Sequence, residues 1–182
     1  MLAENVIVAS GMFAEPRVNL GIPGMDKFQG KIIHSAQYKK PEDFAGQTVL
    51  TVGGCISGVE ISADLVKSVS SVIHQCNKPF FVMGHYMTGE FDINGKKMVK
   101  KVPQDFMGYA RYYLEEKLPE KYEDQVRLKN ERFAKLCRYQ RDAPGVGFKD
   151  SDLNRVMYKT ISTNYVQSVI DKKIMPKMSS IK

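Results

Sequence analysis

The sequence predicts a mixed α/β fold built around a parallel sheet. Two short apolar runs, Thr48–Val52 and Ser71–Cys76, have the length and composition of buried strands. Glycines follow the first run directly, and the residues from 57 to about 68 then carry apolar side chains at helical spacing. A strand, a glycine turn, a helix and a second strand fit within roughly 30 residues, which is the span of a βαβ unit with parallel strands.

Length and composition are those of a globular protein. The 182 residues suit one domain or slightly more, and 43% of them are hydrophobic. No apolar stretch approaches the length that spans a bilayer, and the first ten residues lack the basic start of a secretory signal. The three cysteines (Cys55, Cys76 and Cys137) have no close pairing and no zinc-ligand spacing. We therefore expect no metal site and a cytoplasmic or other reducing compartment, with peripheral membrane association left open.

The net charge of +7 is compatible with nucleic acid, an anionic membrane or a phosphorylated cofactor as a partner. The lysine pairs are spread along the chain, at 39–40, 97–98, 100–101 and 172–173, as on an ordinary solvated surface. Basic and aromatic residues do not interleave on a recognisable platform, which disfavours a nucleic-acid-binding module. We expect no nucleic-acid partner.

The remaining elements are predicted in chain order. Residues 5–10 have the pattern of a short buried strand, and residues 12–47 are a loop-rich connection with many prolines and glycines. Pro103 suits the first turn of a helix that ends near Pro119. A second, charged helix is expected over Glu120–Tyr139, with a buried side made of Val126, Phe133, Leu136 and Cys137.

The last part of the chain has weaker signals. Residues 142–148 are predicted to form a loop. Ser162 or Thr163 could cap a helix that runs to about Lys172. Residues 174–182, IMPKMSSIK, are predicted to form no clear element.

The glycine turn has the spacing of a dinucleotide-binding motif with one change. In the pattern G-x-G-x-x-G the three positions are Gly53, Cys55 and Gly58. The first glycine permits the turn, the second lets the backbone approach a pyrophosphate, and the third lets helix and strand pack closely. Cys55 brings a side chain to the second position, so weaker binding or a shifted ligand is expected. A turn that serves only the fold is the alternative interpretation.

The end of the second predicted strand indicates which dinucleotide would bind. A site for NAD places an acidic residue there to hold the ribose hydroxyls, but residues 74–77 contain none, and Lys78 follows. A cation in this place suits a 2′-phosphate, which favours NADP. The alternative is that Lys78 is a solvated loop residue. His74 is expected to be a hydrogen-bonded core residue, and Cys55 is disfavoured as a catalytic thiol because no resolving cysteine or histidine lies near it in sequence.

The stretch before the glycine turn resembles a known family. Residues 28–38 read FQGKIIHSAQY and match F-x-G-x-x-x-H-x-x-x-(F/Y), the identifying pattern of flavin-containing monooxygenases, through Phe28, Gly30, His34 and Tyr38. VIVASG resembles the segment that closes the first part of the family's FAD domain, and KPFFVMGHYM and ISTNYVQSVIDKKI resemble later segments. The resemblance is strong over residues 5–90 and patchy beyond them.

The resemblance implies an activity and a set of cofactors. In this family NADPH reduces FAD, molecular oxygen forms a C4a-hydroperoxyflavin, and this species oxygenates nitrogen or sulfur in a small nucleophilic substrate. Carried over to this sequence, Gly53, Gly54, Ser57 and Gly58 resemble the turn that binds the NADP(H) pyrophosphate, with Cys55 inside it. Lys78 occupies one of the family's basic positions for the 2′-phosphate. The four identifying residues are expected to shape the interdomain segment.

The resemblance also implies a domain organisation. Residues 1–45 resemble the end of an FAD domain, with a residual strand and a linker, and residues 46–182 resemble a three-layer Rossmann-type NADP domain that is incomplete at its C-terminus. The FAD motif G-x-G-x-x-G is missing, so the chain resembles an internal portion of a monooxygenase, and we expect no independent turnover. The alternatives are a non-catalytic NADP-binding module and a relic, while a different two-dinucleotide reductase is disfavoured by the identifying pattern.

Overall fold

The computed structural model describes residues 4, 7, 15–17, 21–93, 96–104 and 119–179. The chain divides into two compact units, one of residues 1–39 with 181–182 and one of residues 40–180. In the described part of the first unit, short 3-10 turns at Met25–Lys27 and Ser35–Gln37 interrupt an otherwise irregular chain. The predicted loop-rich connection is therefore confirmed over residues 21–39. Of the buried strand predicted at residues 5–10 only Ile7 is described, and it is 92% exposed and part of no strand, contrary to the prediction.

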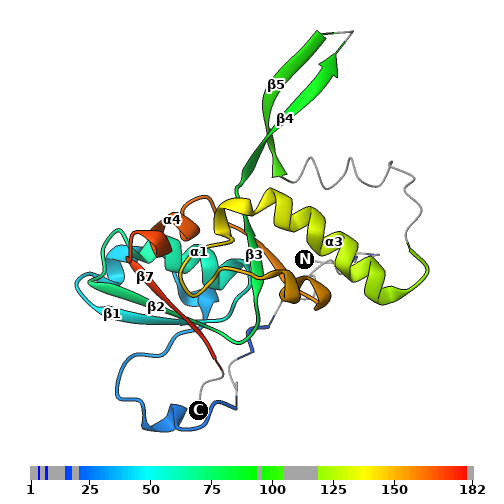
Figure 1. Ribbon diagram of the computed structural model, residues 1–182. Helices are drawn as coiled ribbons and strands as arrows, with labels where there is room; N and C mark the ends of the chain where they lie inside the picture. Colours follow the sequence, from blue (N-terminus) through cyan, green and yellow to red (C-terminus); the bar gives the residue numbers. More distant parts are fainter. Residues whose placement is uncertain are drawn as a thin grey trace. The chain divides into compact units, whose positions relative to one another are not determined.

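The second unit contains the predicted parallel sheet (Figure 1). Its strands are β1 (Thr48–Val52), β2 (Ser71–Cys76) and β7 (Ile174–Met178), in the order β1-β2-β7 and all parallel. The helices α1 (Ile56–Leu65) and α4 (Tyr165–Ile170) contact each other and pack on these strands. The βαβ unit is confirmed, and the fold is mixed α/β with parallel sheets, consistent with a Rossmann-like domain.

A separate two-stranded parallel sheet lies between the three-stranded sheet and a cluster of buried apolar side chains. β3 (Phe80–Met83) pairs with β6 (Tyr158–Ile161), and all four residues of β3 are buried. Successive side chains of a strand point to opposite faces. Phe80 therefore contacts the rings of His74 and Tyr165 on one face, whereas Phe81 packs on the other face against Phe133 of α3 (Tyr122–Leu136). The apolar cluster consists of Phe81, Met83, Phe133, Ala134, Cys137, Phe148, Leu153 and Met157.

The region around Pro103 differs from the prediction. β4 (Tyr86–Ile93) and β5 (Lys96–Pro103) form an antiparallel hairpin, and Pro103 pairs with Tyr86 at its base. Pro103 ends β5, and the next residue, Gln104, is already helical, so the predicted helix begins one residue later than expected. Proline fits here because both strands of a two-stranded hairpin are edges, where a missing N–H need not break the ladder. Residues 105–118, on which the rest of that predicted helix falls, lie outside the described residues.

The charged helix is confirmed with shorter bounds. α3 ends at Leu136, and a 3-10 turn over Arg138–Gln140 follows it. Phe133 and Cys137 are buried as predicted, while Val126 and Leu136 are only half-buried. The loop at residues 142–148 is also confirmed, with Gly145 at a φ of 72°.

The end of the chain is more ordered than predicted. Residues 174–178 form β7, so the prediction of no clear element there is wrong. Pro176 lies inside this strand, which is possible because β7 is at an edge of the sheet and needs ladder bonds on one side only. The predicted helix is shorter than expected, since Lys172 has a φ of 61°, outside the helical region. Ser162 contributes to its start, because its hydroxyl accepts a hydrogen bond from the Tyr165 N–H at 3.3 Å.

Candidate functional site

The glycine turn after β1 leads directly into α1. Gly53 has a φ of 120°, a conformation that residues with a side chain rarely adopt. Its N–H donates to the Gln75 carbonyl at 2.9 Å, so the ladder between β1 and β2 extends one residue past β1. Cys55 is the N-cap residue of α1, and its carbonyl accepts the first helical bond, from Val59, at 3.1 Å. The turn is therefore two residues long and depends on the conformation of Gly53.

Gly58 permits a very close approach of α1 to this turn. A Cβ atom at Gly58 would lie 1.9 Å from the Gly53 carbonyl oxygen and 3.0 Å from its carbonyl carbon. A Cβ atom at Gly54 would instead make ordinary contacts, 3.4 Å from the Phe80 ring and 3.6 Å from Cys76. Gly53 and Gly58 are thus required by geometry, for the turn and for close packing respectively, whereas Gly54 is not.

The outer side of the turn is open to solvent. Cys55, Ile56 and Ser57 are exposed, and the N-cap side chain makes no capping hydrogen bond. The first hydrogen bond within the helix is donated by the Val59 N–H. The N–H groups of the helical residues before Val59 therefore have no acceptor within the helix. Such N–H groups, together with the positive end of the helix dipole, favour an anion. The arrangement can therefore bind a phosphate group, although Cys55 adds a side chain at its mouth.

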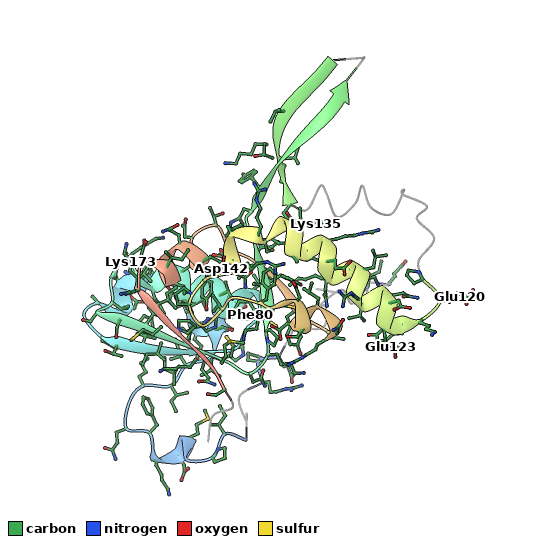
Figure 2. All side chains as sticks on the ribbon, in the orientation of Figure 1. Phe80, Glu120, Glu123, Lys135, Asp142 and Lys173 are labelled. Atoms are coloured by element: carbon green, nitrogen blue, oxygen red, sulfur yellow. The ribbon has the colours of Figure 1, made fainter. Side chains whose placement is uncertain are left out.

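His74 lies beneath the turn on β2. It is fully buried, with Nε2 2.8 Å from the Gly53 carbonyl oxygen and Nδ1 2.6 Å from the Tyr165 hydroxyl. A carbonyl oxygen can only accept, so Nε2 carries the proton and Nδ1 accepts from Tyr165. The prediction of a hydrogen-bonded core histidine is confirmed. Phe80, labelled in Figure 2, completes the surroundings with its ring centroid 6.2 Å from that of His74.

Burial of His74 makes the stability of the fold depend on pH. Burial lowers the pKa of His74, and the bond to the Gly53 carbonyl opposes this only in part. The unfolded chain takes up the proton below about pH 6.5, whereas the folded chain takes it up only at a lower pH. The free energy of unfolding should therefore fall as the pH drops below this value, by at most about 1.4 kcal/mol per pH unit.

Urea denaturation at several pH values between about 7.5 and 5 measures this loss. His74→Gln, which cannot be protonated, is expected to have a smaller slope than the unchanged protein in the same range. The comparison isolates His74 because the other two histidines are present in both proteins. Identical slopes would show that His74 is not the cause.

The two cysteines near the turn have different surroundings. Cys76 is buried, and burial raises the pKa of its thiol to about 12, with a smaller effect from nearby Cys55. Cys55 is an exposed free thiol. Because only the thiolate is a nucleophile, Cys76 is unsuited to covalent chemistry.

Lys78 lies at the same edge of the sheet as the glycine turn. β1 and β2 are parallel, so their carboxyl ends share one edge, and Lys78 is exposed just after β2. Its ammonium is 5.6 Å from the ring centroid of Tyr158, which begins β6. The sequence reasoning missed Tyr158, because nothing local connects it to a segment 80 residues away. Its side chain is 43% exposed.

The four identifying residues lie in the first unit, and the glycine turn lies in the second. The ring of Phe28 packs on Gly30, where a Cβ atom would lie 2.5 Å from it. His34 caps the next 3-10 turn, since its Nδ1 accepts from the Ala36 N–H at 3.1 Å, and Tyr38 ends that turn. These contacts shape the segment locally, and its role between domains stays a prediction.

The described residues contain no cluster of three or more His, Cys, Asp or Glu side chains that could hold a metal ion. In the same part of the chain, no helix combines the length and apolar character needed to cross a membrane.

Comparison with known proteins decides the family. A model of the flavin-binding monooxygenase-like family matches residues 2–143. The chain belongs to the flavin-containing monooxygenase family. Flavin-containing monooxygenases are oxidoreductases that use FAD and NADPH and oxygenate small substrates.

Individual flavin-containing monooxygenases match only part of the chain. Rice (Oryza sativa subsp. japonica) indole-3-pyruvate monooxygenase YUCCA1 is 48% identical over 67 residues, which are 37% of this chain and 16% of the rice protein. Arabidopsis thaliana flavin-containing monooxygenase FMO GS-OX-like 7 is 44% identical over 71 residues, 39% of this chain and 15% of its own length. Rabbit (Oryctolagus cuniculus) dimethylaniline monooxygenase [N-oxide-forming] 4 is 34% identical over 92 residues, 50% of this chain and 17% of its own. The chain thus spans about one sixth of the curated relatives that it matches.

Proposed function

We propose that residues 46–182 are the NADP-binding part of a flavin-containing monooxygenase, a three-layer Rossmann-type domain, and that residues 1–45 are the end of its FAD domain and the linker. One observation carries the proposal. The turn at Gly53 leaves the N-terminal N–H groups of α1 open to solvent, at the sheet edge that also holds Lys78. This combination suits a dinucleotide with a 2′-phosphate.

The residues present fit NADP(H). Gly53 and Gly58 allow β1 and α1 to approach closely, so the N–H groups of the first helical turn would bind the pyrophosphate. Ser57 is exposed beside them and would add a hydroxyl donor. Lys78 would pair with the 2′-phosphate. When bound, NADPH supplies a hydride, and the contribution of this chain is to bind and orient it.

The residues present do not fit FAD. No G-x-G-x-x-G segment precedes Gly53 in the sequence, and among the described residues only the turn at Gly53 joins a strand to a helix through glycines. We therefore propose that oxygenation of a nitrogen or sulfur nucleophile requires an FAD site from outside these 182 residues. The second candidate is a non-catalytic NADP-binding module, which would use the same turn at Gly53 and the same Lys78.

Titration of the purified chain with NADPH and NADH tests the proposed site. NADPH is expected to bind at least about tenfold more tightly than NADH, because a charge-assisted contact with the 2′-phosphate is worth about 1.4 kcal/mol or more. Lys78→Met should abolish this preference and leave NADH binding unchanged. Lys67→Met, which removes an exposed lysine from another part of the unit, should preserve it. Failure to bind either dinucleotide would refute the proposal.

The same preparation tests the flavin part of the proposal. Incubation with FAD and gel filtration are expected to leave no stoichiometric flavin on the chain, and NADPH should not be oxidised. Flavin retained at one molecule per chain would contradict this expectation.

Cys55→Gly is expected to tighten NADPH binding roughly fivefold, about 1 kcal/mol, because it removes an exposed side chain from the mouth of the turn. The backbone of Cys55 is extended, with a φ of −90°, so glycine is not needed there for the fold. Stability should therefore change by less than about 1 kcal/mol. Calorimetric titration of both proteins measures the effect. Equal affinities would mean that the thiol does not obstruct the ligand.

A further inference from the structure

The Gly53 carbonyl group is held from two sides inside the fold. His74 Nε2 lies 2.8 Å from its oxygen, and the α-carbon of Gly58 is so close that a Cβ atom there would lie 1.9 Å from it. His74 itself is held, because its Nδ1 is 2.6 Å from the hydroxyl of Tyr165 at the start of α4. Both side chains are fully buried, so neither can exchange its partner for bulk water.

The orientation of this carbonyl determines the orientation of the next N–H group. In a trans peptide the C=O and N–H bonds point in opposite directions, and the described residues contain no cis peptide. The Gly53 carbonyl points at the His74 ring, so the Gly54 N–H points away from it. Glycine has no Cβ atom to restrict rotation, so a hydrogen bond from outside the turn is needed to hold this peptide plane.

We propose that His74, oriented by Tyr165, is a positioning residue for dinucleotide binding. By holding the Gly53 carbonyl, it fixes the peptide plane that presents the Gly54 N–H to the pyrophosphate. The inference rests on the proposed function, because it assigns His74 a role in the same NADP site. The physical gain is preorganisation: a donor that is already oriented loses less freedom when the ligand binds.

Two replacements of His74 separate its hydrogen bond from its volume. His74→Leu fills the space without a donor, and it should weaken NADPH binding about tenfold, the loss expected for one hydrogen bond. His74→Gln places an amide N–H at similar reach and should retain affinity within about threefold. Tyr165→Phe removes only the hydroxyl that holds Nδ1, and it should weaken binding by an intermediate factor of about three.

Adenosine 2′-monophosphate distinguishes positioning from general damage to the fold. This probe carries the adenine and the 2′-phosphate but no pyrophosphate, so its affinity should stay the same in all three variants. Thr160→Val is the matched control: Thr160 is fully buried on β6, and its hydroxyl has no hydrogen-bond partner in the described part of the chain. This variant should bind NADPH and the probe like the unchanged protein.

Each outcome of these titrations has one meaning. If the unchanged protein does not bind NADPH, the proposed function fails. If it binds NADPH and both His74→Leu and Tyr165→Phe bind it equally well, the positioning role is overturned. Parallel losses of NADPH and of the 2′-monophosphate would also overturn it in favour of a structural role. If His74→Leu does not fold, the NADPH and 2′-monophosphate affinities of Tyr165→Phe are compared with those of His74→Gln, and the same criteria apply.

Discussion

Replacement of Gly58 by alanine is expected to destabilise the fold by about 3 kcal/mol and to abolish NADPH binding. The new Cβ atom would lie 1.9 Å from the Gly53 oxygen, a backbone atom that cannot rotate away. Either β1 and α1 separate or the turn changes conformation, and overpacking of this kind costs up to about 3 kcal/mol or more. For a chain of this size the melting temperature should drop by roughly 6 to 12 °C.

Gly54→Ala is the matched control for this effect. It adds the same methyl group two residues before α1, where the nearest atom is 3.4 Å away in the Phe80 ring. Thermal unfolding of Gly54→Ala should therefore differ from that of the unchanged protein by less than about 0.5 kcal/mol. Equal melting temperatures for Gly58→Ala and Gly54→Ala would contradict the close approach of α1 to the turn.

Replacement of Gln140 by leucine is expected to destabilise the fold by about 3 kcal/mol or more. The fully buried amide of Gln140 accepts from the Val82 N–H at 2.8 Å and donates to the carbonyls of Phe80 and Val146 at 2.7 and 2.8 Å. Its side chain thus pairs with the main chain of β3. Leucine has a similar size but leaves these buried groups without this partner, and each unsatisfied group costs about 1 to 3 kcal/mol.

Gln167→Leu provides the control for the Gln140 variant. Gln167 lies on α4, is exposed, and donates one hydrogen bond to Asp171 at 2.8 Å. The same substitution there should change the free energy of unfolding by less than about 0.5 kcal/mol. Chemical denaturation of both variants gives the comparison. Similar small effects would mean that β3 does not depend on the Gln140 amide.

Local patterns predicted the βαβ unit well. The bounds of β1 and β2 agree with the prediction, and α1 differs by only a few residues. These elements could be predicted because short apolar runs, a glycine turn and a helical stripe are all contained within one stretch of chain. The glycine spacing also pointed to the turn, and the structure gives Gly53 and Gly58 distinct geometric roles.

The strands that the sequence analysis missed contain proline at sheet edges. Residues 174–182 are predicted to form no clear element, yet Pro176 lies inside β7. Pro103, predicted for the first turn of a helix, ends β5 immediately before the helical residue Gln104. Whether proline is tolerated in a strand depends on which side of that strand is paired. A linear sequence does not contain this information, because the partner strand comes from elsewhere in the chain.

The sequence by itself determined the βαβ unit, the glycine turn, the absence of an acidic residue before Lys78 and the family resemblance, since each depends on residues that are neighbours in the chain. Only the tertiary structure decided what holds these parts in place. It brought Tyr165 to His74 across 91 residues and Gln140 to the main chain of β3 across about 60. Such contacts form when buried polar groups must find partners inside the folded core, and the fold alone determines which partners are within reach.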